Sequence, residues 1–517
     1  MRAYSRVSCD AICSSTFEAA QPRANQSANA ETCMANHNKA LLMSLTLIAT
    51  LGGLLFGYDT AVISGAISAI DVNFIHPRQL DETAALSLSG FAVASALWGC
   101  VIGGLLAGKI GDRFGRRAGM QLAALLFLIS AIGSAWPEIG FAPVGEMGAD
   151  ALWPFIVYRI IGGIGIGLSS MLSPLYIAEI SPPAERGRMV TYQQLAIVGG
   201  IVLVYFVNWS IAGQGDESWL HSTGWRWMLA SEAIPAAAFF VLLFFVPESP
   251  RWLVMKQREA EAKAVLQRLT NEAEAQTVLT EIKGSLQVSS DRLFAFGGLV
   301  IVVGLLLSIF QQTVGINAVL YYAPQMFQNM GASTDSALLQ TLIVGSANAV
   351  FTLVAMFTVD RWGRKPLLIL GAVMMAVSML ALGGLFHSQQ LGLLSLLMVI
   401  VYIAGFALSW GPIVWVLLAE IFPNAIKGKA MSLAVAVQWI ANLIVSWSFK
   451  VIDGNSALNE VFHHGFAYYL YGAMSILAAI FVYRFVPETK GRSLEQIQAL
   501  WQPTNKTLAA EAKPAQA

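Results

Sequence analysis

Twelve apolar runs, each about 20 residues long, limit the folds open to this chain more than any other feature. They lie near residues 41–69, 85–109, 119–136, 153–178, 190–211, 226–246, 295–329, 336–358, 366–386, 392–418, 429–450 and 465–486. A run of this length crosses a lipid bilayer as a helix, because a helix satisfies its own backbone hydrogen bonds where water is absent. Charged residues make up only 12% of the chain, against about 25% in soluble domains. The sequence therefore predicts an all-α membrane protein with twelve transmembrane helices.

Basic residues concentrate in alternate loops between these runs. Lys109, Arg113, Arg116 and Arg117 follow the second run, and the loops after the fourth, eighth and tenth runs are also basic. Because basic loops stay on the cytoplasmic side, we expect a multi-pass protein of the cell inner membrane with both termini in the cytoplasm. The chain has 31 basic and 31 acidic residues, so nothing indicates a nucleic-acid partner.

The polar segments divide the chain into five parts. Residues 1–40 lack the apolar core of a secretory signal and are expected to be a disordered tail, with Met34 as an alternative start. Two six-helix bundles are expected over residues 41–248 and 293–488. Residues 249–292 between them read as a cytoplasmic linker of short amphipathic helices, and residues 489–517 as a cytoplasmic tail.

Three polar motifs occur twice, in the same order. Residues 111–117 recur as 359–365, residues 179–188 as 420–429, and residues 247–251 as 487–491. The nearly constant spacing indicates two pseudo-symmetric halves. Many transporters are built from repeated halves with a binding site between them.

The repeated motifs carry charges that could lock the two halves together. Arg113, Glu179, Arg186 and Glu248 in the first half correspond to Arg364, Glu420, Lys427 and Glu488 in the second. At cytoplasmic helix ends, ion pairs among them could bridge the halves when the inner side is shut. The alternative is a solvated charged face that only sets topology, since an exposed pair contributes about 0–1 kcal/mol. Lysine cannot form the planar bidentate pair of arginine, so the lock of the second half is expected to be looser.

Three amide side chains interrupt the seventh apolar run. Gln311, Gln312 and Asn317 lie where the surrounding residues are hydrocarbon-like, and Gly315 between them allows the helix to bend. An amide in a membrane helix is costly unless it is hydrogen-bonded, so such groups face a cavity or another helix. Each amide offers both donors and acceptors, as a neutral polyhydroxylated ligand requires. We therefore expect this stretch to bind a sugar.

A carboxylate lies near the middle of the first apolar run. An ionised Asp59 at that depth costs about 2.5–3.5 kcal/mol, so it must be paired, solvated or protonated. Arg159 in the fourth run is the natural partner, and Glu232 in the sixth can join them. A carboxylate whose cationic partner comes and goes can carry a proton. The alternative is a static buried salt bridge that only fixes helix packing.

Seven stretches together identify a family that this chain resembles. They are residues 52–65, 111–117, 158–163, 247–252, 311–322, 411–415 and 487–491. Over residues 41–501 the chain resembles the sugar porters of the major facilitator superfamily, and among them the bacterial D-xylose–proton symporters. The resemblance implies two six-helix bundles that alternate access to a central sugar site, with Asp59 and Arg159 as the proton-coupling pair.

The resemblance also implies which residues hold the sugar. Its hydroxyls would be bound by Gln194, Gln311, Gln312, Asn317, Asn348, Trp415 and Gln438, while Phe56, Tyr321 and Trp439 would line or close the pocket. An indole ring can cover the C–H face of a pyranose and bond a hydroxyl through its N–H. The alternative is that the aromatic residues form an interfacial belt and the amides join helices.

One position departs from the xylose-symporter pattern. Seven residues after Gln194 those proteins carry a glutamine, whereas this chain has Ile201, as hexose facilitators do. We expect proton-coupled uptake of an aldose, with D-xylose first. A hexose transporter or an uncoupled facilitator of the same fold is the alternative.

Other classes of protein fit the sequence less well. A sugar receptor would need a substantial signalling tail, and few residues follow Trp501. No nucleophile–base pair or metal-ligand spacing is discernible, so we expect neither an enzyme nor a cofactor. The expected partners are a sugar, a proton and the bilayer, and the fold requires no second chain.

Overall fold

A computed structural model describes residues 23–182, 185–286, 293–294, 297–423 and 426–490. Twelve helices in this part of the chain are long and apolar enough to cross a membrane. Each of the twelve apolar runs overlaps one of them, which confirms the predicted fold class.

The first six spans are built from seven main helices. These are α2 (Arg23–Val62), α4 (Glu82–Phe114), α5 (Arg116–Ala135), α6 (Leu152–Ile180), α7 (Arg186–Ala212), α9 (Trp225–Ala230) and α10 (Ala233–Leu242), with short α3 (Ile67–Ile70) and α8 (Glu217–Trp219) between spans. The last six spans are built from α14 (Gly298–Thr313), α15 (Ile316–Tyr321), α17 (Thr334–Trp362), α18 (Arg364–His387), α19 (Leu393–Gly405), α20 (Gly411–Ile421), α21 (Lys427–Gly454) and α23 (Phe466–Phe485). Short helices α16 (Ala323–Asn329) and α22 (Ser456–Phe462) connect spans of this second half.

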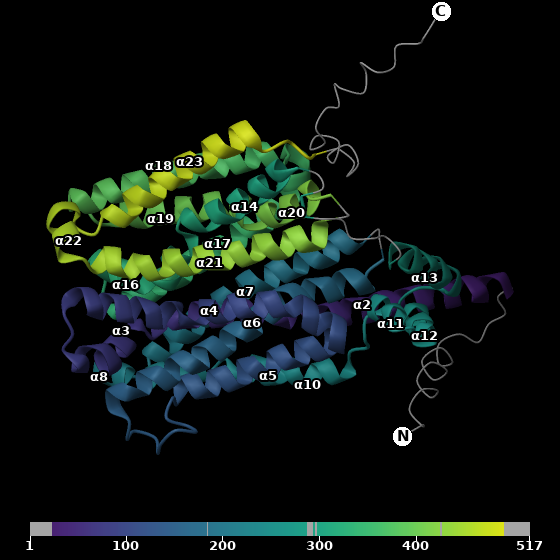
Figure 1. Cartoon of the computed structure of the whole chain (residues 1–517), viewed down its shortest axis with the longest axis horizontal. Helices are drawn as coiled ribbons and strands as arrows, with labels where there is room; N and C mark the ends of the chain where they lie inside the picture. The colour runs from purple at the N-terminus through teal and green to yellow at the C-terminus, as the bar shows by residue number, and fades with distance from the viewer. Residues whose placement is uncertain (1–22, 183–184, 287–292, 295–296, 424–425, 491–517) are drawn as a thin grey trace, which may run out of the picture.

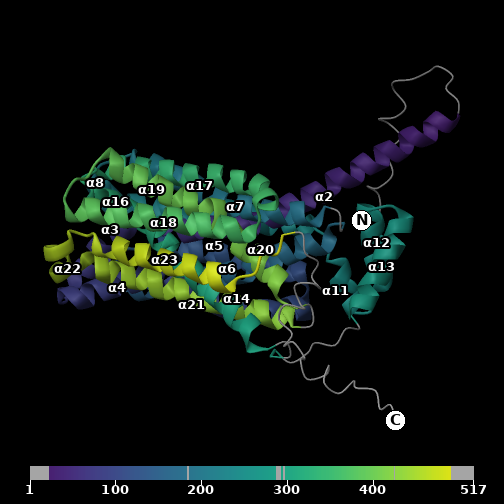
Figure 2. The same cartoon turned by 90° about the horizontal axis from the view of Figure 1, so that it is seen from above.

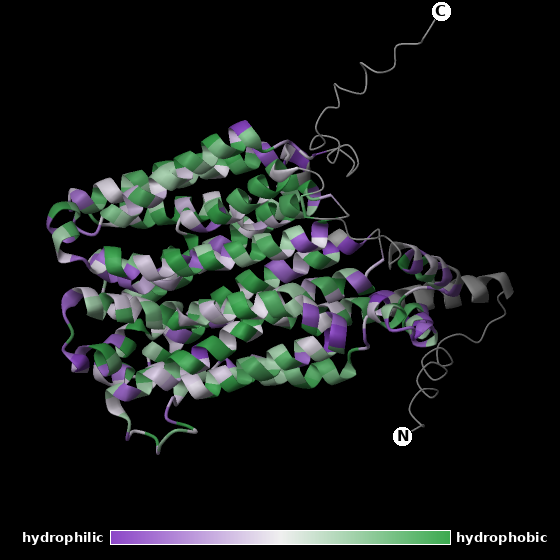
Figure 3. Cartoon of the chain, viewed as in Figure 1, coloured by the Kyte–Doolittle hydropathy of each residue, from purple (hydrophilic) through white to green (hydrophobic). Residues whose placement is uncertain are grey.

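The two halves lie one above the other along the whole bundle (Figure 1). Helices α3, α8 and α22 lie at one end, which we call the far end. Helices α11 (Pro250–Met255), α12 (Glu259–Leu269) and α13 (Glu272–Leu286) lie at the other, which we call the insert end. Apolar residues cover the spans, whereas polar residues gather at the two ends and on α11–α13 (Figure 3). This distribution matches a slab of hydrocarbon around the middle of the bundle.

The seventh span breaks at the predicted bend. Gly315 separates α14 from α15 and has a φ of +94°, a left-handed conformation that glycine adopts without a steric cost. The ring of Tyr471 occupies the space that a side chain at Gly315 would need. The break lies between Gln312 and Asn317, two of the amide residues of this span.

The linker between the halves folds into the expected amphipathic helices. Trp252, Leu253, Ala262, Leu266 and Leu279 from α11, α12 and α13 form a small apolar core of their own. The insert is thus a compact helical unit attached to the ends of the spans.

The N-terminal segment differs from the expected tail. Helix α2 begins at Arg23, so residues 23–40 are helical, and residues 1–22 lie outside the described residues. Residues 23–40 contain neither glycine nor proline, and extending a formed helix costs far less than starting one.

Candidate functional site

The predicted pair of Asp59 and Arg159 is formed in the structure. Asp59 on α2 and Arg159 on α6 are 0% and 1% exposed, and the guanidinium Nη1 donates to Asp59 Oδ1. Nη2 also donates to the backbone oxygen of Asp59 at 3.2 Å. Within the described part of the chain, Asp59 Oδ2 and Arg159 Nε have no hydrogen-bond partner. The pair is therefore closed to solvent in this conformation, and each of its two side chains can still form one more hydrogen bond.

Glu232 lies between α9 and α10 and is 1% exposed. Its Oε1 has no hydrogen-bond partner among the described residues. Asp59, Glu232 and Arg159 are therefore all buried in the first half, and each of the three has a polar atom without a hydrogen-bond partner among the described residues.

The predicted amides form a network in the second half. Gln311 Nε2 donates to the backbone oxygen of Trp410 at 2.9 Å, and Gln311 Oε1 accepts from Nε2 of Gln438. Asn317 Nδ2 donates to Gln312 Oε1 at 2.6 Å, and Gln312 Nε2 lies 3.4 Å from Gln311 Oε1. These amides therefore point toward one another and not into lipid. They come from α14, α15 and α21, which the break at Gly315 brings together.

The remaining predicted sugar residues lie on other spans. Gln194 on α7 and Trp415 on α20 are half-buried, whereas Asn348 on α17 is buried. Phe56 and Trp439 join the halves, with ring centroids 5.4 Å apart.

A further amide, Asn442, belongs to the same region. Its Nδ2 donates to the hydroxyl of Tyr321 at 3.4 Å. Asn442 follows Gln438 by one helical turn on α21, so the two share a face. That spacing is visible in the sequence and would have identified it.

The halves also touch at the far end through contacts that the sequence analysis did not predict. Lys450 Nζ on α21 donates to Asp71 Oδ2 at 2.9 Å and to Gln325 Oε1 at 3.1 Å. Ser89 Oγ donates to Asp71 Oδ1 at 2.5 Å. We call Asp71, Ser89, Gln325 and Lys450 the far-end clasp, because Asp71 and Ser89 belong to the first half and the other two to the second.

Three further hydrogen bonds join the two halves beside the clasp. Glu82 accepts hydrogen bonds from the backbone N–H and the hydroxyl of Ser456, at 3.0 and 2.8 Å. Trp447 Nε1 donates to the backbone oxygen of Ser87 at 2.9 Å. The far end is therefore held shut by a row of polar contacts between α4 and the end of α21.

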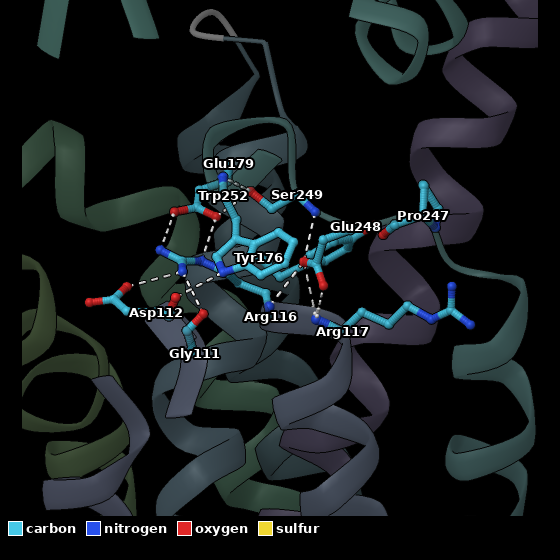
Figure 4. A network of polar contacts seen from close by, with 10 residues as sticks. All are labelled: Gly111, Asp112, Arg116, Arg117, Tyr176, Glu179, Pro247, Glu248, Ser249 and Trp252. Carbon is cyan, nitrogen blue, oxygen red and sulfur yellow. Dashed lines mark hydrogen bonds and ion pairs between the residues drawn. The ribbon is translucent and has the colours of Figure 1, made fainter. Parts of the chain in front are cut away.

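A charged cluster lies at the insert end of the first half (Figure 4). Arg116 Nε and Nη2 donate to the two oxygens of Glu179 at 3.0 and 3.1 Å, a bidentate pair. Glu248 Oε1 accepts the backbone N–H of Arg116 at 2.9 Å. Ser249 Oγ donates to Glu179 Oε2 at 2.5 Å.

The second half repeats this arrangement. Arg364 Nη2 donates to Glu420 Oε1 at 3.0 Å, and Glu488 accepts the backbone N–H groups of Arg364 and Lys365 at 3.1 and 3.0 Å. Gly115 and Gly363, both with positive φ, leave the room that the carboxylates of Glu248 and Glu488 occupy. The sequence repeat is therefore a repeat of local structure as well.

Glu248 and Glu488 occupy equivalent positions in the two halves, but their pKa values are shifted in opposite directions. Burial raises the pKa of Glu248 above its ordinary value, despite the N–H groups of Ser249, Arg117 and Arg116. Burial acts in the same direction on Glu488, but the backbone N–H groups of Lys490, Arg364 and Lys365 outweigh it and hold its pKa below the ordinary value.

One part of the predicted lock needs correction. Arg113 is exposed with its guanidinium 5.2 Å from the Phe114 ring, and Arg116 makes the contact with Glu179 instead. Arg116 is also the residue that the repeat aligns with Arg364, so the choice of Arg113 was an error of register. In this conformation the Arg116–Glu179 and Arg364–Glu420 pairs each lie within one half, and bridging of the halves stays a prediction for the state in which the inner side is shut. Arg186 is exposed and Lys427 is half-buried.

The chain is similar to known sugar transporters in sequence and in fold. Residues 45–501 match the family described as "Sugar (and other) transporter". The D-xylose-proton symporter of Escherichia coli strain K12 is 54% identical over 479 residues, which cover 91% of this chain and 98% of that protein. The glucose facilitated diffusion protein of Zymomonas mobilis is 49% identical over 468 residues, covering 90% and 98%. The inward open structure of the xylose transporter XylE from E. coli superimposes with a TM-score of 0.81 at 52% identity, covering 89% of this chain and 100% of that one.

Proposed function

This chain belongs to the sugar transporter family of the major facilitator superfamily, and we propose that it carries an aldose and a proton together across the membrane. Alternating access between the two halves would move both. D-xylose is the first choice of sugar, because a D-xylose-proton symporter is 54% identical over nearly its whole length. Its relatives are transporters and not enzymes.

The observation that best supports proton coupling is that Asp59 is buried and paired with Arg159. Because an aldose is neutral, the membrane potential can act only on a charge that travels with it. Asp59 is fully buried, paired with Arg159, and keeps Oδ2 without a partner among the described residues. A proton that binds Oδ2 from outside neutralises the carboxylate and weakens its hold on Arg159. Glu232, buried in the same half, is the third member of this proposed proton site.

The energy available to such a carrier follows from the charge moved. One proton moving inward is worth about 2.3 kcal/mol per 100 mV, which sustains roughly a fiftyfold sugar gradient. Each pH unit adds about 1.4 kcal/mol.

The sugar site is proposed to form around the amide network. Gln311, Gln312, Asn317 and Gln438 each present an amide that now bonds a neighbouring amide or a backbone oxygen, and that could exchange this partner for a hydroxyl. Half-buried Trp415 offers a ring face. Gln194, Asn348, Phe56, Trp439 and Tyr321 complete the proposed lining.

Hexose transport is the alternative that one residue favours. Ile201 is buried on α7, seven residues after Gln194, and offers no hydrogen bond to a sugar. The Zymomonas relative named for glucose is 49% identical. The panel of sugars tested must therefore include hexoses.

The insert end is proposed to face the cytoplasm of an inner-membrane protein, with both termini on that side, because the basic loops lie there. The clasp would then close the outer side in this conformation. When the inner side shuts, Arg186 and Lys427 could reach across to Glu179, Glu248, Glu420 and Glu488, beside Arg364. A single chain would suffice for the whole cycle.

Proteoliposomes test this function directly. Adding sugar outside should make the external medium more alkaline, with D-xylose giving the largest response in a panel of pentoses and hexoses. Asp59→Asn should abolish this response and leave sugar exchange between equal pools intact. Accumulation that continues unchanged in the variant would refute proton coupling through Asp59. A response to hexoses alone would reassign the substrate.

A further inference from the structure

Four buried polar atoms in the proton-site region share an unusual property. Asp59 Oδ2, Arg159 Nε, Glu232 Oε1 and Ser130 Oγ all lack a hydrogen-bond partner within the residues that the structure describes. They come from α2, α6, α5 and the turn before α10. Buried polar groups are nearly always hydrogen-bonded, so a concentration of exceptions needs an explanation. Three of the four belong to the proposed proton machinery. Ser130 has no assigned part in it.

The backbone of Gly162 shows where Ser130 points. A side chain built at Gly162 would collide with two oxygens at once, Ser130 Oγ and Asp59 Oδ2. Both lie under 3.0 Å from that single point, so the hydroxyl faces the carboxylate oxygen that Arg159 leaves free. They make no direct bond in this conformation, and at most one water could fit between them.

We propose that Ser130 is a positioning residue of the proton site, which accepts the hydrogen bond of protonated Asp59. The proposal rests on the proposed function. A proton from the external water binds Asp59 Oδ2, and the carboxyl group becomes neutral. Its O–H then donates to Ser130 Oγ, directly or through one water. Ser130 gains and loses no proton of its own, and no other bond forms or breaks. It stabilises the loaded form while Arg159 is released.

A substitution at Ser130 removes none of the charged and titratable groups around Asp59. Arg159 faces Asp59 from α6, Glu232 from the turn before α10, Cys100 from α4 and Tyr321 from α15. A change in the pH dependence of transport after loss of the Ser130 hydroxyl can therefore be assigned to that hydroxyl.

The chain supplies a matched control. Ser134 lies one turn further along α5, is 1% exposed, and has an equally unpartnered hydroxyl. It is not among the atoms nearest to Gly162. Ser130→Ala and Ser134→Ala therefore remove the same group from the same helix, and only the first removes it from Asp59.

The experiment measures D-xylose-driven proton uptake by the full-length chain in proteoliposomes across a range of external pH. Losing one hydrogen bond to the protonated form should move the half-maximal pH downward by about 0.5–1 unit in Ser130→Ala. Exchange of labelled sugar, which needs no net proton movement, should keep its wild-type rate in both variants. Ser134→Ala should keep the wild-type midpoint.

Three results would overturn the proposal. They are a wild-type midpoint in Ser130→Ala, an equal shift in Ser134→Ala, or a loss of exchange in Ser130→Ala that marks the hydroxyl as structural. Failure of the proposed function looks different, because the wild-type protein itself would then show no sugar-driven proton movement.

Discussion

Replacing Lys450 with methionine should open the far end. Lys450 and Asp71 have side chains only 6% and 18% exposed, and the 2.9 Å bond between them joins the two halves. A hydrogen bond between charged groups contributes about 1.5–3 kcal/mol. Part of this is recovered by hydration of both groups once the far end opens. A net effect of about 1–2 kcal/mol changes the ratio of closed to open forms by roughly 5- to 30-fold.

Pulsed electron paramagnetic resonance can measure this shift. Spin labels at Leu80 and Glu460, which are exposed at the far ends of opposite halves, would report the distance between them, with the native cysteines replaced by serine. Lys450→Met should raise the population of the longer distance. Combining it with Asp71→Asn should cost less than the sum of the two single changes, because the partners are in contact.

A salt bridge within one half provides the control. Arg78 and Asp150 pair at 3.2 Å near the same end, and both belong to the first half. Arg78→Met should leave the distance distribution unchanged. If Lys450→Met gives the wild-type distribution as well, the clasp does not hold the far end shut.

Three further outcomes are expected. Arg116→Lys should lower the melting temperature because lysine cannot keep the bidentate bond, at a cost of about 1.5–3 kcal/mol, whereas exposed Arg113→Lys should melt like wild type. Gly162→Ala places a methyl group against Ser130 Oγ and Asp59 Oδ2 and should destabilise the protein by about 1–3 kcal/mol in thermal unfolding, so a variant of full stability would contradict the packing. The hydrogen bond to Asp453 raises the pKa of His464. The contribution of this bond to the free energy of unfolding is therefore fully present below the unfolded pKa of about 6.5 and is lost as the pH rises through the folded pKa. Stability should therefore fall between about pH 6 and pH 8 more in wild type than in His464→Asn, and equal pH profiles would refute the pairing.

The features that could be predicted from the sequence are those that depend on the chemistry of a few residues and not on the packing of the whole chain. The apolar runs give the spans, since a membrane leaves a chain few alternatives. The Gly315 break and the pairing of Asp59 with Arg159 follow from conformational freedom and from the cost of an isolated buried charge. Both were found from single residues without knowledge of the packing.

What the sequence did not reveal depends on how helices that are distant in the chain pack against one another. Lys450 stands at the end of an apolar run, where a lysine usually reaches the bilayer surface, and nothing nearby in the chain indicates Asp71 as its partner. Ser130 looks like any small residue of a packed helix until the backbone of Gly162 shows what it faces. The error over Arg113 had another cause. Arg113 and Arg116 are close in the sequence but lie on different faces of a helix end, and only the alignment of the repeat with Arg364 distinguishes them.

The amide network has a consequence for turnover. In this conformation Gln311 has its carbonyl and its side-chain N–H groups engaged by protein neighbours, whereas the buried Oε1 of Gln438 has no partner among the described residues. At the proposed sugar site, an aldose would have to replace those bonds of Gln311 with bonds of similar strength, so its net gain would be correspondingly small. Such a site captures its cargo loosely and lets it go readily, which suits a protein whose task is throughput and not storage.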